Sequence, residues 1–210
     1  MVKRNLKVTK VRVEKKHRTI ELDNGNVFRI SEDVFLSNPL FEGDKVTHEL
    51  LKKITSQQTE KEVRGAGLRL IKYRPRSRYE LYERLIKKGF PKDYVLSALS
   101  WFEEYQFIDD TVFAKSFANE KVKNKKIGPI ALKAEFFPHR LDEDLVLSVM
   151  NEVYKKTPEE DLIRIHIQKK KLDNAESLSK KEFKKLSDFL KRKGFRWDAI
   201  RTVFIEHGWL

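Results

Sequence analysis

The sequence predicts a mainly α-helical fold, with three tandem three-helix repeats in an elongated, curved array preceded by a small antiparallel β-sheet. Three observations lead to this prediction. A helical motif recurs along the chain, helix start and stop signals surround its copies, and short β-branched runs are confined to residues 1–30. Each repeat of such an array buries its apolar face mainly against its neighbours, and arrays usually bind other macromolecules along an extended surface.

The recurring motif has the form Leu-x3-Leu-x3-Gly-Phe-x2-Asp and begins once at Leu81 and once at Leu186. A degraded copy spans residues 132–150, about halfway between the two. The motif glycines, Gly89 and Gly194, are expected to end helices in the left-handed conformation that a Cβ disfavours. The phenylalanines that follow them are expected to be buried at equivalent positions: Phe90 and Phe195.

Start signals precede each copy of the motif. Ser77-x2-Glu80 and Ser179-x2-Glu182 have the spacing of a capping box, and Gly128-Pro129 places proline at a first helical position. Asp109 is the expected cap of a further helix. A preceding and a following helix complete each unit, which gives nine helices in units 59–107, 108–156 and 157–210, with the first helix starting near Thr59.

Residues 1–50 are expected to form a separate β-rich module of about three strands. Apolar β-branched and aromatic residues form three short runs, beginning at Val8, Ile20 and Val27. Asn24-Gly25 suits a two-residue hairpin, and His17-Arg18 marks a looser turn before it. A short helix is expected near Ser31 to Leu36.

The composition indicates a soluble, charge-rich chain. It has 45 Lys and Arg against 32 Asp and Glu, a formal net charge of +13, and no cysteine. The lack of cysteine excludes disulfides, thiolate catalysis and cysteine-ligated zinc. The sequence contains neither an apolar run long enough to span a membrane nor a signal peptide, so a cytoplasmic location without membrane contact is expected.

The charge is unevenly distributed. Residues 1–75 hold 17 basic and 10 acidic side chains, residues 76–154 hold 13 of each, and residues 155–210 hold 15 and 9. Two basic ends around a neutral middle favour contact with a polyanion at both ends. Solubility alone is the alternative explanation.

Several basic clusters are candidate nucleic-acid or filament-binding residues. An arginine cluster lies beside Tyr73 and Tyr79, where it either binds phosphate and bases or only frames a helix start. Lysine clusters follow in the second and third units, and each taken alone is also consistent with a solvated helix face. The candidates in these units are Arg74, Arg76, Arg78, Lys123, Lys125, Lys126, Lys169, Lys170, Lys184, Lys191 and Arg192.

Lys10 and Arg12 are further candidates in the N-terminal module. Strand alternation would place both on one face, opposite Val11 and Val13, and leave a basic face for a phosphate backbone. The alternative is an edge strand that its lysines protect from aggregation.

No catalytic, cofactor-binding or metal-binding constellation is found in the sequence. The five histidines are too scattered for helical metal-ligand spacing. Asp109-Asp110 could be a metal pair, but the apolar stripe that follows favours helix capping. Gly65-Ala66-Gly67 lacks the strand and the Lys-Ser/Thr of a phosphate-binding loop.

The ordered motifs of residues 59–210 resemble the RecX family of RecA regulators. The similarity lies in Arg76-Ser77-x2-Glu80-Leu81-x3-Leu85-x2-Lys88-Gly89-Phe90, Phe107-Ile108-Asp109-Asp110-x2-Phe113-Ala114, Gly128-Pro129 and Lys193-Gly194-Phe195. The resemblance implies three helical repeats that bind RecA–DNA filaments and modulate recombinase activity in recombination, repair and the SOS response. The chain departs from the family at Arg140, where the second unit usually has a glycine, so its motif helix is expected to end early near Pro138.

The leading hypothesis is therefore a non-enzymatic regulator, expected to inhibit the recombinase, with the RecA filament and single-stranded DNA as partners. Double-stranded DNA is a further expected partner, and a monomer is expected. A stand-alone nucleic-acid-binding protein is the alternative function. An enzyme with an unrecognised site is a third. Salt dependence separates the first two, because pure phosphate binding weakens steeply with salt.

Overall fold

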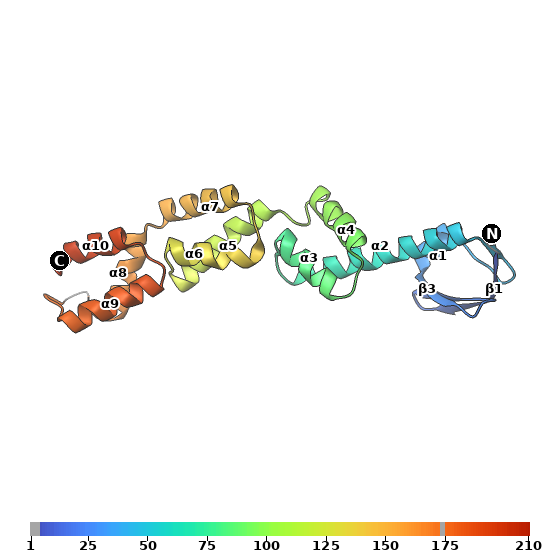
Figure 1. Cartoon of the computed structure of the whole chain (residues 1–210), viewed down its shortest axis with the longest axis horizontal. Coiled ribbons are helices and arrows are strands. Elements are labelled where there is room, and N and C mark those ends of the chain that lie inside the picture. Colours follow the sequence, from blue (N-terminus) through green and yellow to red (C-terminus); the bar gives the residue numbers. More distant parts are fainter. Residues whose placement is uncertain (1–4, 173–174) are drawn as a thin grey trace. The chain divides into compact units, whose positions relative to one another are not determined.

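The computed structural model describes residues 5–172 and 175–210 of the chain. Within these residues it has four β-strands, ten α-helices and one short 3-10 helix (Figure 1). Contacts among these residues divide the structure into two compact units, which are not the three predicted repeat units. The first compact unit is residues 5–73 with 84–101, and the second compact unit is residues 74–83 with 102–210. The elements are β1 (Leu6–Glu14), β2 (His17–Leu22), β3 (Val27–Ser31), α1 (Glu32–Ser37), β4 (Lys45–Val46), α2 (His48–Tyr73), α3 (Arg78–Lys87), α4 (Lys92–Glu104), α5 (Asp110–Lys125), α6 (Pro129–Phe136), η1 (Phe137–His139), α7 (Glu143–Lys156), α8 (Glu159–Lys169), α9 (Lys180–Arg192) and α10 (Trp197–Glu206).

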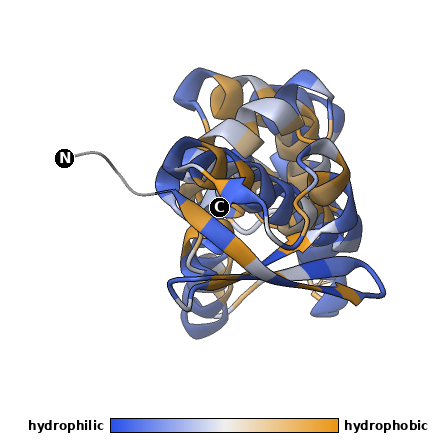
Figure 2. Ribbon diagram, turned by 90° about the vertical axis from the view of Figure 1, so that its right-hand side faces the viewer, coloured by the Kyte–Doolittle hydropathy of each residue, from blue (hydrophilic) through white to orange (hydrophobic). Residues whose placement is uncertain are grey.

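The predicted antiparallel sheet is present, with four strands in the order β3-β2-β1-β4. Hydrophilic and hydrophobic residues alternate along its strands (Figure 2). A register shift between Val8 and Lys10 interrupts the β1–β2 pairing. A bulge adds one residue to a strand and changes which side chains face the core. Val8 and Val11 consequently both pack against the core of the sheet. From Lys10 to Glu14 the register is regular, so Lys10 and Arg12 alternate with Val11 and Val13 as predicted.

The turns of the sheet are partly as predicted. Gly25 has φ +81° in the hairpin between β2 and β3, as predicted. The predicted two-residue loop is wrong, because the Leu22 amide donates to the Asn26 carbonyl and leaves three loop residues, 23–25. The looser turn predicted at His17-Arg18 lies instead at Lys15-Lys16, because both predicted turn residues pair with β3.

Helix α2 begins at His48, eleven residues before the predicted start near Thr59. Ile54 is fully buried in the core of the sheet, and Leu50 and Leu51 pack against the same core. Tertiary packing of an apolar face supplies most of a helix's stability. The first half of α2 is therefore part of the core that the sheet forms with this helix.

The two motif glycines end their helices as predicted. Gly89 has φ +86° and Gly194 has φ +85°. Phe195 is also buried as predicted, but Phe90 is only half-buried. Their surroundings explain the difference, because nothing lies within 4 Å of the position a Cβ would take at Gly89, whereas Gly194 packs against Ala131.

The predicted helix caps are also confirmed where the structure shows them. The Asp109 carboxylate accepts hydrogen bonds from the backbone amides of Thr111 (2.7 Å) and Val112 (3.0 Å). Ser179 and Glu182 form a complete capping box at the start of α9. Gly128 caps α6, with Pro129 at its first position.

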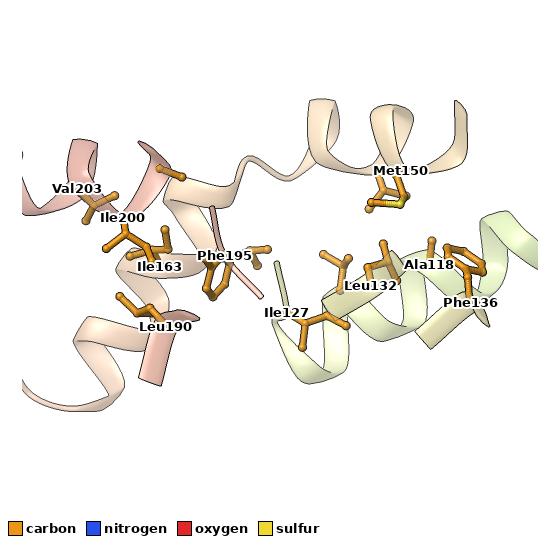
Figure 3. Close-up of a cluster of buried hydrophobic side chains, with 14 of the residues drawn as sticks. Ala118, Ile127, Leu132, Phe136, Met150, Ile163, Leu190, Phe195, Ile200 and Val203 are labelled. Atoms are coloured by element: carbon orange, nitrogen blue, oxygen red, sulfur yellow. The ribbon is translucent and has the colours of Figure 1, made fainter. Parts of the chain in front are cut away.

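The second compact unit is held together by a continuous apolar core (Figure 3). Phe195 lies between the buried side chains of Ile163 and Leu190 and those of Ile127 and Leu132. It thus joins α8 and α9 to α5 and α6.

Two glycines permit a close backbone approach at this junction. The Gly128 amide donates to the Lys193 carbonyl (2.9 Å), and the Ile130 amide donates to the Gly194 carbonyl (3.0 Å). A Cβ at Gly128 would lie 2.3 Å from the Gly194 oxygen, far inside van der Waals contact. The stop signal of the last motif is therefore packed directly on the start signal of α6.

The motif helix of the middle copy ends early, as predicted. Helix α6 stops at Phe136, and a 3-10 turn that contains Pro138 leads to Arg140. Arg140 itself has φ +46°, the left-handed conformation that a glycine adopts without strain.

Candidate nucleic-acid interface

The structure brings together three basic segments that are far apart in the sequence. The Nε2 atom of His166, on α8, lies 2.7 Å from the Lys126 carbonyl oxygen at the end of α5. The Gly128–Lys193 hydrogen bond joins the same end of α5 to the end of α9. The end of α5, the end of α8 and the end of α9 therefore lie close together. The lysines at these three ends are Lys126, Lys169, Lys170 and Lys193.

An aromatic ring lies within this basic cluster. The ammonium groups of Lys170 and Lys193 lie 4.1 Å and 5.9 Å from the centroid of the Phe189 ring. The His166 ring meets Phe189 edge-to-face at 5.3 Å and Phe195 at 5.8 Å. A lysine held over an aromatic face gains cation–π attraction, which fixes part of its direction without neutralising its charge. We call Lys126, His166, Lys169, Lys170 and Lys193 the His166 cluster.

The imidazole at the centre of the His166 cluster is neutral at pH 7. Burial lowers its pKa below the usual value, and the nearby charges of Lys193, Lys169 and Lys126 lower it further, while its bond to the Lys126 carbonyl opposes them. Because a carbonyl oxygen only accepts, Nε2 carries the proton of the neutral ring. His166 thus acts as a buried spacer that holds the end of α5 against α8.

The cations of the His166 cluster lack acidic partners. Among residues 5–172 and 175–210, no ion pair joins Lys126, Lys169, Lys170 or Lys193 to a carboxylate. Glu182, which shares a pocket with Lys170, is held in the capping box of α9. Unneutralised cations that converge on one surface create the positive potential that attracts a phosphate backbone.

Trp197 lies next to this region in the sequence. It is the first residue of α10, is 41% exposed, and has the Lys191 ammonium 4.9 Å from its ring centroid. Exposed aromatic rings with neighbouring basic side chains are typical of proteins that bind single-stranded nucleic acid by base stacking. Phe189, His166 and Trp197 were not among the binding residues predicted from the sequence, whereas Lys193 directly follows the predicted Lys191 and Arg192. The alternation of Lys, Phe and Trp in residues 189–197 is the signal that could have indicated them.

The basic residues predicted as binding residues in the second and third repeats fall into three groups. Lys126, Lys169 and Lys170 belong to the His166 cluster, and Lys191 and Arg192 directly precede its Lys193. Lys123 is exposed at the end of α5, whereas Lys125 beside it is paired with Glu135 at 2.6 Å. Lys184 is exposed on α9, two helical turns before Lys191.

The predicted arginine cluster has a structural role in this conformation. Arg76 is only 5% exposed and pairs with Glu80, which also binds Arg74 at 2.5 Å. Arg78 pairs with Glu103 at 2.8 Å. The interpretation that these arginines frame the start of α3 is therefore favoured over phosphate binding, and the buried Arg76 cannot present its guanidinium to a phosphate.

The predicted basic face of the N-terminal sheet is largely neutralised. Lys10 is exposed, but Arg12 pairs with Glu21 at 2.7 Å, and Arg29 on β3 pairs with Glu14 at 2.5 Å. Cross-strand ion pairs of this kind reduce the local field. The first unit is thus a weaker candidate for a phosphate backbone than the His166 cluster.

Two searches within the described residues bear on other classes of site. Residues 5–172 and 175–210 contain no group of three or more His, Asp or Glu side chains arranged to hold a metal ion. No helix in this part of the chain is both long and apolar enough to cross a membrane.

Comparison with known proteins identifies the family. Residues 64–102 match the model of the first three-helix domain of RecX. A curated regulatory protein RecX from Chlorobaculum tepidum is 31% identical over 137 residues, which cover 65% of this chain and 82% of the relative. The chain belongs to the RecX family. The regulatory protein RecX of Clostridium botulinum (strain Eklund 17B / Type B) is 26% identical over 95% of both chains.

Solved structures support the fold. A crystal structure of regulatory protein RecX has a TM-score of 0.71 at 18% identity and covers 94% of this chain and 98% of its own. The structure of RecX from Lactobacillus salivarius has a TM-score of 0.64 at 19% identity and covers 71% of this chain. The chain therefore has a mainly helical fold with a small N-terminal antiparallel sheet. Membership of the RecX family gives it a regulatory role.

Proposed function

We propose that this protein regulates the RecA recombinase by binding RecA–DNA filaments in the cytoplasm, and that binding inhibits recombinase activity. Membership of the RecX family supports the partner. The observation that carries the DNA contact is the His166 cluster, where lysines at the ends of α5, α8 and α9 converge and form no ion pair with a carboxylate of residues 5–172 or 175–210. A protein with this surface can bind phosphates that remain accessible in a protein–DNA filament.

The proposed mechanism is steric rather than chemical. We propose that the nine helices α2 to α10 act as three tandem three-helix units, each able to contact a different part of the filament. Proteins built from repeats use extended surfaces of this kind to bind large partners. Occupation of the filament groove by such units would block entry of a second DNA strand and slow the nucleotide cycle.

Cosedimentation tests the proposal. RecA would be assembled on single-stranded DNA with a slowly hydrolysed ATP analogue, and the full-length protein would be added over a range of concentrations. We expect saturable cosedimentation that requires the assembled filament, together with inhibition of strand exchange at the same concentrations. Absence of binding to the assembled filament would refute the proposal.

The alternative is a protein that binds nucleic acid without RecA. It is favoured by one observation: within the described part of the chain, the lysines of the His166 cluster have no acidic partner, which would suit naked DNA equally well. Salt titration separates the two functions. Binding to phosphates alone weakens steeply as salt is raised, whereas an interface that includes protein contacts weakens less.

A further inference from the structure

Helix α6 is apolar on two faces, but only one of them is buried. Leu132 and Phe136 are almost completely buried in the core of the second unit. On another face, Ile130, Ala134 and Phe137 recur at the i, i+4, i+7 spacing of a single helical stripe. Ile130 is 61% exposed and Phe137 is 85% exposed. Large apolar side chains that share one stripe are normally buried, so the exposure of Ile130 and Phe137 leaves this stripe free to contact a partner.

The exposed stripe forms one wall of an apolar groove. Val146 and Met150, one turn apart on α7, line the opposite wall, and Phe136 and Leu141 also contribute to the lining. The groove has a volume of about 970 Å³. This is at the upper end of the range for binding pockets. Contiguous apolar surface exposed on a soluble protein usually marks an interaction site.

The polar groups of the groove are few. Its charged lining residues are Lys133, Arg140 and Glu143. Lys133 and Glu143 pair with each other at 2.9 Å. Among the described residues, no ion pair joins Arg140 to a carboxylate, and its guanidinium lies 4.5 Å from the Tyr79 ring centroid. The groove therefore presents one unneutralised cation at an otherwise apolar surface.

These features limit what can occupy the groove. Both walls are helices whose backbone groups are bonded internally, so an extended segment would leave its own amides and carbonyls unpaired. A helix satisfies its backbone internally and can present apolar side chains at matching spacing. Charge complementarity with Arg140 requires a carboxylate beside that apolar face.

We propose that the groove between α6 and α7 docks an amphipathic helix of the recombinase, which packs apolar side chains on Ile130, Phe137 and Met150 and pairs a carboxylate with Arg140. This inference rests on the proposed function, and it assigns the protein contact to the groove and the DNA contact to the His166 cluster. The neutral middle of the chain suits this division, because a protein surface does not require the phosphate-binding charge that a DNA backbone does.

Two groove variants of the full-length protein test the proposal. The Ile130→Ser/Phe137→Ser variant removes apolar anchors that are already exposed. Arg140→Gly removes the cation and also suits the left-handed conformation at that position. Val112→Ser is the matched control, because Val112 is 64% exposed on α5 and does not line the groove. Circular dichroism would confirm that all three variants are folded.

Affinity would be measured for the assembled RecA filament and, separately, for a labelled single-stranded oligonucleotide. We expect each groove variant to lose about tenfold or more in filament affinity, the effect of removing an interface anchor, with DNA affinity unchanged. The control should match the wild-type protein in both assays.

The contrary outcomes are distinguishable. Filament binding by the groove variants equal to that of the wild type would overturn the groove assignment and leave the proposed function intact. Failure of the wild-type protein to bind the filament would overturn both. A second copy of this chain in the groove would give a concentration-dependent dimer in sedimentation velocity that Phe137→Ser abolishes, and this result would overturn the proposed occupant.

Discussion

The contact between Gly128 and Gly194 provides a quantitative test of how the stop signal of one motif packs on the start signal of another. Replacing Gly128 by alanine introduces a Cβ 2.3 Å from the Gly194 carbonyl oxygen and 2.5 Å from the Phe195 amide nitrogen. The φ of Gly128 is −83°, which any residue adopts, so the substitution adds no conformational strain of its own. Its whole cost comes from the close approach of the two backbones.

The expected magnitude follows from what must move. Ordinary carbon–oxygen contacts lie near 3.3 Å or more, so the two segments must separate by about 1 Å. This separation weakens the Gly128–Lys193 and Ile130–Gly194 hydrogen bonds. A loss of about 0.5–1.5 kcal/mol for each bond, with about 1–3 kcal/mol of overpacking strain, gives a total of roughly 2–6 kcal/mol.

Gly89 offers the matched comparison, because it has the same left-handed conformation as Gly194 but open space at the Cβ position. Gly89→Ala should cost only about 1 kcal/mol, since the strain of about 1–2 kcal/mol is partly offset by a less flexible unfolded chain. Gly194→Ala should combine both penalties. Amide hydrogen exchange measured by mass spectrometry gives a local unfolding free energy for each segment, so both compact units can be followed. A Gly128→Ala protein within about 0.5 kcal/mol of the wild type would refute the packing argument.

Three further predictions concern charge and pH. Reversal of Lys169, Lys170 and Lys193 to Glu should weaken single-stranded DNA binding and reduce the slope of log affinity against log salt by about 2. The control is reversal of three lysines of α2 (Lys52, Lys53 and Lys72), which should change neither quantity. Equal effects of the two variants in a salt titration would show that the His166 cluster is not the binding site. Lys10→Glu should leave DNA affinity unchanged in the same assay, because the neighbouring arginines of the sheet are already paired, and a marked loss would restore the basic-face hypothesis. Burial lowers the pKa of His166 and His139 in the folded protein, so the unfolded state binds protons more tightly than the folded state. The free energy of unfolding should therefore fall as the pH drops through the ordinary histidine pKa of about 6.5. Urea unfolding between pH 8 and pH 5 would show this fall, and a His139→Gln/His166→Gln protein with an unchanged pH dependence would contradict it.

Local signals in the sequence were sufficient to predict most of the helical framework. Capping residues, helix-stopping glycines and apolar spacing act over one or two turns, so the start of α9 at Ser179 and the stop at Gly194 could be predicted from adjacent residues. The early end of α6 was predicted from Pro138 and from the arginine that replaces the usual glycine of the family, whereas the left-handed conformation of Arg140 was not predicted. The start of α2 was missed because its first turns are stabilised by the packing of Ile54 on the sheet, which is a tertiary effect.

The candidate nucleic-acid interface was only partly predictable. The sequence indicates which segments are basic, but pairing with acidic residues depends on the fold. Arg76 and Arg78 resemble phosphate-binding residues in the sequence, yet both are paired with glutamates. Glu80 lies only four residues after Arg76, whereas Glu103 is brought to Arg78 by the fold. Lys126 and Lys170 are separated by more than forty residues, and only the packing of α5 against α8 through His166 brings them together.

The same distinction explains why the α6–α7 groove is the most informative surface of the second unit. Isoleucine and phenylalanine are among the residues most often buried, so their type alone does not distinguish Ile130 and Phe137 from core residues. In the fold, Leu132 and Phe136 are the α6 residues that pack in the core, and the exposed side chains of Ile130 and Phe137 do not contribute to it. Apolar surface that folding does not use is costly in water and favours association. The neutral middle of the chain, residues 76–154, carries this stripe and is therefore better suited to hold a protein partner, while the lysines of the His166 cluster hold the DNA.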